Sequence, residues 1–195
     1  SLDLAQAVVA RAPTQALAAQ ARAWRALGAA PAALALWRAV AARETSVEAW
    51  VEIHALASAT GDASLATRAA ALIEGLARLD GAQGGRDRRG VLRFHAARGE
   101  WRQALALARA DLSERPDVYA DAQLAWIAGA LGDTATARDH AERALRLGTA
   151  DPLLRWQAGS ALVRIGDARG AALVAAARTA LPWLPAAADG VLATR

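Results

Sequence analysis

Residues 117–150 read DVYADAQLAWIAGALGDTATARDHAERALRLGTA. Two stretches rich in alanine, leucine and arginine lie on either side of the step Gly132-Asp133. Alanine, leucine and arginine are strong helix formers, whereas a Gly-Asp step is typical of a turn. The stretch therefore predicts two helices joined by a short turn.

Similar steps recur along the chain at Gly28-Ala29, Gly61-Asp62, Gly99-Glu100, Gly132-Asp133 and Gly166-Asp167. Their spacings are 33, 38, 33 and 34 residues. A nearly constant period in this range indicates stacked repeats, because one helical pair cannot bury its apolar face alone. Five residues after each glycine stands an alanine: Ala33, Ala66, Ala104, Ala137 and Ala171. Small side chains permit close helix crossings, so we expect these alanines to mark them.

The repeated unit resembles the tetratricopeptide repeat, a helix-turn-helix unit of about 34 residues. The matching residues are Leu124-Ala125, Gly132-Asp133, Ala137 and Ala144 in residues 117–150, with Trp50, Pro116 and Gly159 in other units. The resemblance covers essentially the whole chain. It implies an all-α fold, an α-solenoid in which antiparallel helix pairs form a right-handed superhelix.

The predicted repeats are residues 14–46, 47–80, 86–116, 117–150 and 151–182. Residues 1–13 are expected to be the second helix of a truncated repeat, so that the natural protein would continue N-terminally. Residues 183–195 are expected to form a C-terminal cap. The stretch LDGAQGGRDRRG at residues 79–90 contains four glycines and is predicted to be a loop.

The composition limits the classes of function. The chain has 195 residues, of which 55% are hydrophobic, and it contains no lysine, asparagine, cysteine or methionine. The net charge of +4 is modest, and the pI of 11.0 reflects arginine more than a nucleic-acid-binding surface. No uninterrupted apolar run is long enough for a membrane span. The composition suggests a soluble bacterial protein, cytoplasmic or periplasmic.

No catalytic, metal or cofactor site is predicted. His54, His95 and His140 lie in different repeats, and none has a metal-ligand partner one helical turn away. The segment GAQGG at residues 81–85 lacks both the preceding strand and the following lysine of a phosphate-binding loop. We therefore expect a protein that is not an enzyme.

In tetratricopeptide proteins the first helix of each repeat faces a concave groove that binds a partner. Counting back from each glycine places the following candidate residues in that groove: Arg22, Arg25, Arg86, Arg89, Arg93, Tyr119, Trp126, Trp156 and Arg164. Arginines bind carboxylates, and exposed aromatic rings provide large contact areas. This pattern predicts an acidic peptide partner with apolar anchors. The alternative is that the arginines form a solvated face and that Trp126 and Trp156 pack between neighbouring first helices.

The expected function is a protein–protein interaction scaffold that binds a peptide or helix of a partner. One alternative is RNA binding, although the small net charge and the interspersed acidic residues argue against it. Another is self-association through the truncated N-terminal repeat. The remaining tryptophans are interpreted as structural, with Trp24, Trp37 and Trp50 at core positions.

Overall fold

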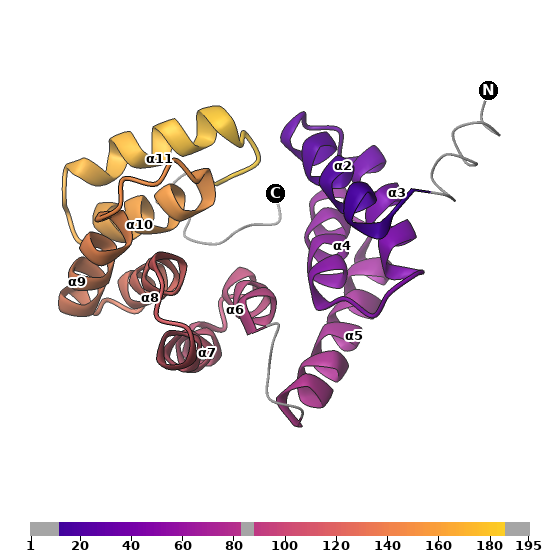
Figure 1. The fold of residues 1–195 in the computed structure, drawn as a ribbon, viewed down its shortest axis with the longest axis horizontal. Coiled ribbons are helices and arrows are strands. Elements are labelled where there is room, and N and C mark those ends of the chain that lie inside the picture. Colours follow the sequence, from indigo (N-terminus) through magenta and orange to yellow (C-terminus); the bar gives the residue numbers. More distant parts are fainter. Residues whose placement is uncertain (1–11, 83–87, 186–195) are drawn as a thin grey trace. The chain divides into compact units, whose positions relative to one another are not determined.

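The computed structural model describes residues 12–82 and 88–185. Within these ranges all regular secondary structure is helical, which confirms the predicted all-α fold. The described helices form two compact units, unit 1 before residue 88 and unit 2 from residue 88 onward (Figure 1).

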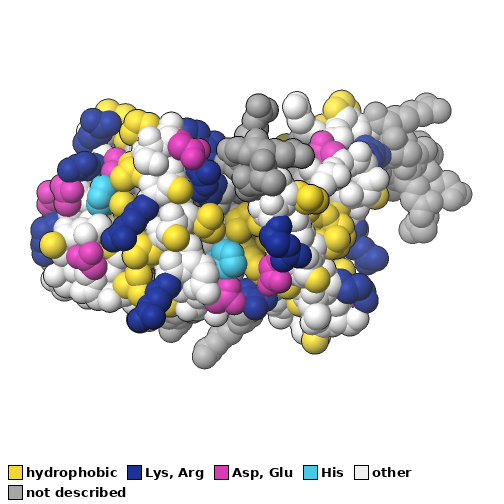
Figure 2. Space-filling view, turned by 90° about the horizontal axis from the view of Figure 1, so that it is seen from below, with side chains coloured by type: hydrophobic (Ala, Val, Ile, Leu, Met, Phe, Trp, Pro, Cys, Tyr) yellow, Lys and Arg dark blue, Asp and Glu magenta, His cyan; other side chains and the backbone are white. Residues whose placement is uncertain are grey.

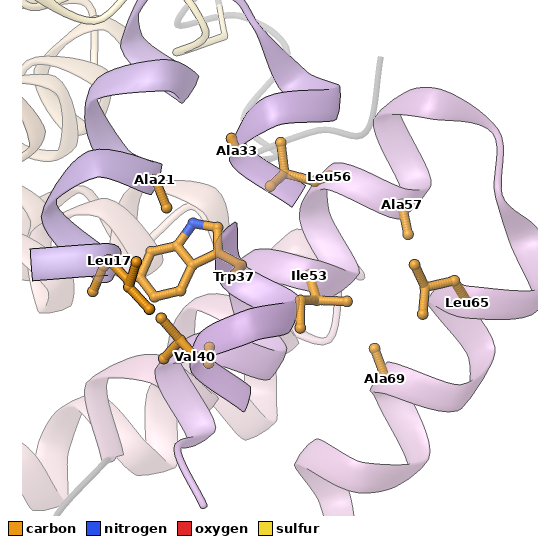
Figure 3. Packing of buried hydrophobic residues seen from close by; sticks show 12 residues of the cluster. Leu17, Ala21, Ala33, Trp37, Val40, Ile53, Leu56, Ala57, Leu65 and Ala69 are labelled. Carbon is orange, nitrogen blue, oxygen red and sulfur yellow. The ribbon is translucent and has the colours of Figure 1, made fainter. Parts of the chain in front are cut away.

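Within residues 12–82, unit 1 contains two helical hairpins. Its helices are α2 (Thr14–Ala26), α3 (Ala30–Ala41), α4 (Val47–Thr60) and α5 (Ala63–Ala82). Each helix packs against the next one in the chain. Trp37 of α3 is 1% exposed and lies among Leu17, Ala21, Val40 and Ile53 in the core (Figure 3). This burial confirms the structural interpretation of Trp37.

Unit 2 contains three hairpins. Its helices are α6 (Arg88–Ala97), α7 (Trp101–Glu114), α8 (Val118–Ala130), α9 (Thr134–Leu145), α10 (Pro152–Arg164) and α11 (Arg169–Ala180). Consecutive helices pack together, and α10 also packs against α8. Many of the contacts among α8, α9 and α10 involve alanine, including Ala125, Ala137 and Ala161, which are fully buried. Small side chains thus allow these three helices to approach closely.

The same turn closes every hairpin. All five glycines that mark the period have a positive φ, between 74° and 80°. In each turn the residue after the glycine donates its N–H to a carbonyl of the preceding helix, as Asp133 does to Ala128 at 2.9 Å. This is the Schellman arrangement that ends a helix at a left-handed glycine. The Asp133 carboxylate then accepts the Thr136 N–H at 3.1 Å, so the Gly-Asp step ends one helix and caps the next.

The predicted alanine register holds in part. Three of the five alanines are fully buried, as expected: Ala33, Ala104 and Ala137. Ala66 is half-buried, whereas Ala171 is exposed, so the prediction for Ala171 is wrong. Gly170 makes the close crossing in that hairpin instead. A Cβ atom at Gly170 would lie only 2.6 Å from the carbonyl oxygen of Gly159 on α10.

Two other expectations need correction. The predicted loop at residues 79–90 is helical at both ends, because α5 continues to Ala82 and α6 begins at Arg88. Residues 83–87 between them lie outside the described residues, as do residues 1–11 of the expected half repeat and residues 186–195 of the expected cap. Trp24 is 45% exposed, so it is not a core residue, and Trp50 is half-buried.

Candidate partner-binding surface

Arg22 and Arg25 project from α2 and pair with carboxylates of α4. Arg22 donates to Glu48 at 2.7 Å, and Arg25 pairs with Glu52. The Arg25 pair is largely shielded, since the two side chains are 16% and 13% exposed. These two arginines therefore connect neighbouring first helices within unit 1, and their charges are balanced internally. They do not supply the free positive charge that the sequence pattern predicts.

Arg89 is also bound by its own chain. Its Nε donates to the fully buried carboxylate of Asp111 at 2.7 Å, and its Nη2 donates to Asp117 at 2.9 Å. Burial alone would lower the pKa of Arg89, but the hydrogen bonds to Asp117 and Asp111 raise it above its ordinary value. Asp117 caps α8 by accepting the N–H groups of Tyr119 and Ala120. Arg89 thus holds α6, α7 and the start of α8 together.

Arg93 and Arg164 differ from the other candidate arginines that the structure describes. Neither has an ion pair among the described residues, and the Nε of each is buried without a hydrogen-bond partner there. Burial lowers the pKa of the Arg164 guanidinium below its usual value. A guanidinium nitrogen that is shielded from water and lacks an acceptor is energetically unfavourable. The last candidate arginine, Arg86, lies outside the described residues.

The two candidate tryptophans are internal. Trp126 of α8 and Trp156 of α10 are each 0% exposed, so the prediction that they present open rings to a groove is wrong. Their ring centroids lie 5.4 Å apart at an interplanar angle of 63°, and Trp101 contacts Trp126 edge-on at 5.5 Å. Edge-to-face pairs of this kind stabilise packing beyond area burial. The alternative interpretation, packing between neighbouring first helices, is therefore correct. Tyr119 remains 41% exposed at the start of α8.

The sequence interpretation missed several polar side chains in unit 2. Gln123 of α8, Gln157 of α10 and Ser160 of α10 are nearly or fully buried, and Gln123 Oε1, Gln157 Nε2 and Ser160 Oγ have no described partner. Gln123 and Gln157 occupy equivalent positions, nine residues before the turn glycine of their hairpins. That recurrence of one polar residue type is the signal by which the sequence would have revealed them.

We define the first-helix surface of unit 2 by the side chains that α6, α8 and α10 contribute to it. They are the half-buried Arg93 and Arg164 together with the buried Gln123, Trp126, Trp156, Gln157 and Ser160. Of these side chains only the two guanidinium groups are partly exposed, whereas the two indole rings, the two amides and the hydroxyl are buried. The buried groups become available to a ligand only if it displaces part of the chain that covers them.

Two histidines of unit 2 take part in local pairs with carboxylates. Nδ1 of His140 lies 2.7 Å from Oδ1 of the buried Asp121, and Nδ1 of His95 lies 2.6 Å from Oε2 of Glu100. Burial would raise the pKa of Glu100, but His95 and Arg98 lower it below its ordinary value. No group of three possible metal ligands occurs within residues 12–82 and 88–185.

Unit 1 contains a cavity that the sequence does not predict. A cavity of about 290 Å³ lies among α3, α4 and α5, and its lining includes Trp50, Leu65, Leu72, Arg38 and Arg68. Its chemistry is that of an apolar recess with two guanidinium groups. Neither arginine has an ion pair with a described residue, although Arg68 donates to a neighbouring serine hydroxyl at 2.8 Å.

Charges of both signs are mixed on the surface. On the face drawn in Figure 2, arginines lie among acidic and hydrophobic side chains and do not form a continuous basic patch. Among the described helices, none has both the length and the apolar character that a membrane crossing requires. No protein-family model matches the chain, and no curated protein matches it.

Proposed function

We propose that the chain is a tetratricopeptide-like solenoid with a right-handed superhelix. In this proposal it acts as a non-catalytic scaffold and binds a short peptide or helix of a partner protein on the first-helix surface of unit 2. The five identical Schellman turns and the packing of consecutive helices within each unit support a repeat architecture.

The observation that carries the binding proposal is a set of buried polar atoms of α6, α8 and α10 that lack partners. They are Arg93 Nε, Gln123 Oε1, Trp126 Nε1, Gln157 Nε2, Ser160 Oγ and Arg164 Nε. Leaving one buried polar group unsatisfied costs about 1–3 kcal/mol, and native structures contain few such groups. A polypeptide backbone carries both N–H donors and C=O acceptors, so a peptide that displaced the part of the chain covering these groups would offer complements to the donors and the acceptors among them.

The paired arginines favour a protein ligand over a nucleic acid. Arg22, Arg25 and Arg89 are bound to carboxylates of the same chain, which leaves them little capacity for phosphates. Of the described candidates, only Arg93 and Arg164 have a buried guanidinium nitrogen that lacks an acceptor. The partner is therefore expected to be mainly apolar, with at most one or two carboxylates or backbone carbonyls facing these arginines.

Selection of binders from a random peptide library displayed on phage, with the intact chain as target, tests the proposal. A selected peptide should bind Arg93→Glu about tenfold more weakly than the wild type, because the reversed charge removes a donor from the surface. Arg109→Glu on α7 is the matched control, since Arg109 is exposed on a second helix, and it should bind the peptide as the wild type does.

Equal binding of the selected peptides to both variants would refute the assignment of this surface. If no peptide is enriched and an RNA oligonucleotide instead binds with a steep salt dependence, the nucleic-acid alternative is favoured.

A further inference from the structure

The segment that follows α11 folds back onto unit 2. Its sequence from residue 181 to residue 185 is LPWLP, and it is not helical. Pro182 and Pro185 lack backbone N–H groups and oppose a continued helix. The segment begins at the C-cap residue Leu181, whose N–H still bonds to the Ala177 carbonyl at 2.8 Å, and turns so that Leu184 N–H meets the Leu181 carbonyl at 3.0 Å.

Unit 2 binds this segment through one apolar anchor and two backbone carbonyls. The side chain of Leu184 is 1% exposed and belongs to the same buried cluster as Trp126 and Trp156. The indole Nε1 of Trp156 donates to the Pro185 carbonyl at 2.8 Å, and Nε of Arg178 donates to the Leu184 carbonyl at 3.0 Å. An anchored leucine with carbonyls bound by side chains is how a peptide ligand is held.

The segment leaves much of the surface's hydrogen-bonding capacity unused. It satisfies Nε1 of Trp156, yet Gln157 Nε2 and Ser160 Oγ on the same helix have no partner in the described structure, nor does Trp126 Nε1 on α8. Buried polar atoms without a partner are few in native structures. A ligand that replaced residues 181–185 and also supplied partners for these buried atoms would therefore gain hydrogen bonds that the resident segment does not make.

We propose that the first-helix surface of unit 2 recognises short apolar segments with a leucine next to proline. The segment Leu181–Pro185 is the resident example, and a partner segment of the same kind displaces it. This inference rests on the proposed function, because it names the ligand class and the regulation of the same surface. Residues 181–185 compete at a high effective concentration because they are tethered to α11, so the resident segment weakens the binding of every external ligand.

The test uses a fluorescently labelled peptide, TALPWLP, which copies residues 179–185. Leu184→Asp removes the anchor of the resident segment within the intact chain. We expect this variant to bind the peptide about tenfold more tightly than the wild type does, as measured by fluorescence anisotropy. The matched control is Leu147→Asp, since Leu147 is 68% exposed in the turn after α9, and it should bind the peptide as weakly as the wild type.

A second variant and a control peptide complete the test. Arg178→Gln removes one hydrogen-bond donor to the segment and leaves the core unchanged. This variant should also bind the peptide more tightly than the wild type, by a smaller factor than Leu184→Asp. It provides the test if Leu184→Asp does not fold. A peptide in which the leucine between tryptophan and proline is replaced by aspartate should not bind. If Leu184→Asp is folded by circular dichroism and shows no gain, or if Arg178→Gln shows none when Leu184→Asp is unfolded, the inference is overturned.

These outcomes also distinguish the inference from the proposed function. If library-selected peptides bind in an Arg93-dependent manner while TALPWLP never binds, the surface is a peptide site but residues 181–185 are not its resident ligand. If neither kind of peptide binds any variant, both proposals fail.

Discussion

The crossing of α10 and α11 provides a sharp test of the packing. A Cβ atom at Gly170 would lie 2.6 Å from the Gly159 carbonyl oxygen and 2.6 Å from the Val163 backbone nitrogen. Both obstacles are backbone atoms, so Gly170→Ala requires the two helices to move apart. Overpacking of this kind costs about 1–3 kcal/mol, whereas alanine's better helix propensity returns at most about 1 kcal/mol. Because both contacts are with backbone atoms, we expect the upper end of the overpacking cost and therefore a net loss of about 2 kcal/mol in the free energy of unfolding.

A matched glycine in the other unit isolates the packing effect. Gly75 lies within α5, where the nearest heavy atom to an added methyl group would be the end of the flexible Arg78 side chain at 3.9 Å. Gly75→Ala should therefore stabilise unit 1 by about 0.5–1 kcal/mol through helix propensity alone. Urea unfolding followed by circular dichroism measures both variants, with separate transitions fitted if the units unfold independently. The reasoning is refuted if Gly170→Ala is as stable as the wild type while Gly75→Ala gains stability.

Other substitutions test the remaining contacts. Trp37→Ala should lower the free energy of unfolding by about 3–5 kcal/mol in thermal unfolding, because the Trp37 ring fills the core of unit 1. Trp24→Ala should change it by about 0.5 kcal/mol or less. Equal losses in the two variants would contradict the assigned burial. Ala137→Leu should destabilise unit 2 by about 1–3 kcal/mol through overpacking, and an unchanged melting temperature would mean that the helix crossing is wrongly placed. Burial opposes ionisation of Asp117, but hydrogen bonds from Ala120 and Arg89 hold its pKa below the ordinary value. The ionised carboxylate therefore stabilises the folded state fully above about pH 4, and this stabilisation is lost as the pH falls through the lowered pKa of the folded state. In Asp117→Asn the free energy of unfolding should therefore fall less steeply with decreasing pH than in the wild type. An acid limb identical to that of the wild type would contradict this role.

The sequence predicts the hairpins well because their turns are encoded locally. A glycine such as Gly132 ends a helix through its own positive φ, and the next residue caps the following helix, so neighbouring residues alone determine the turn. Ala171 is the position at which the five-residue spacing from glycine to alanine does not predict the helix crossing. Which small residue lies at a crossing depends on the rotation of both helices, and α11 uses Gly170 against Gly159 instead.

The candidate site was less accessible from sequence. Periodicity places Arg89 on the expected helix face, but it does not reveal that Asp111 and Asp117 converge on it from two other helices. For the same reason the sequence places Trp126 on a first helix but does not reveal that its side chain is buried in the protein interior. Burial and ion pairing depend on residues distant in the chain, whereas helix phase depends on near neighbours.

Hydrogen exchange at the Trp156 indole N–H tests most directly whether the first-helix surface of unit 2 holds a peptide segment. Trp156→Phe assigns the signal in a proton–nitrogen NMR spectrum, and the indole of Trp24, which is 45% exposed, provides the reference for rapid exchange. The account predicts that the Trp156 signal is protected in the wild type, loses protection in Leu184→Asp and regains it when TALPWLP is added. Exchange of the wild-type Trp156 indole as fast as that of Trp24 would contradict it.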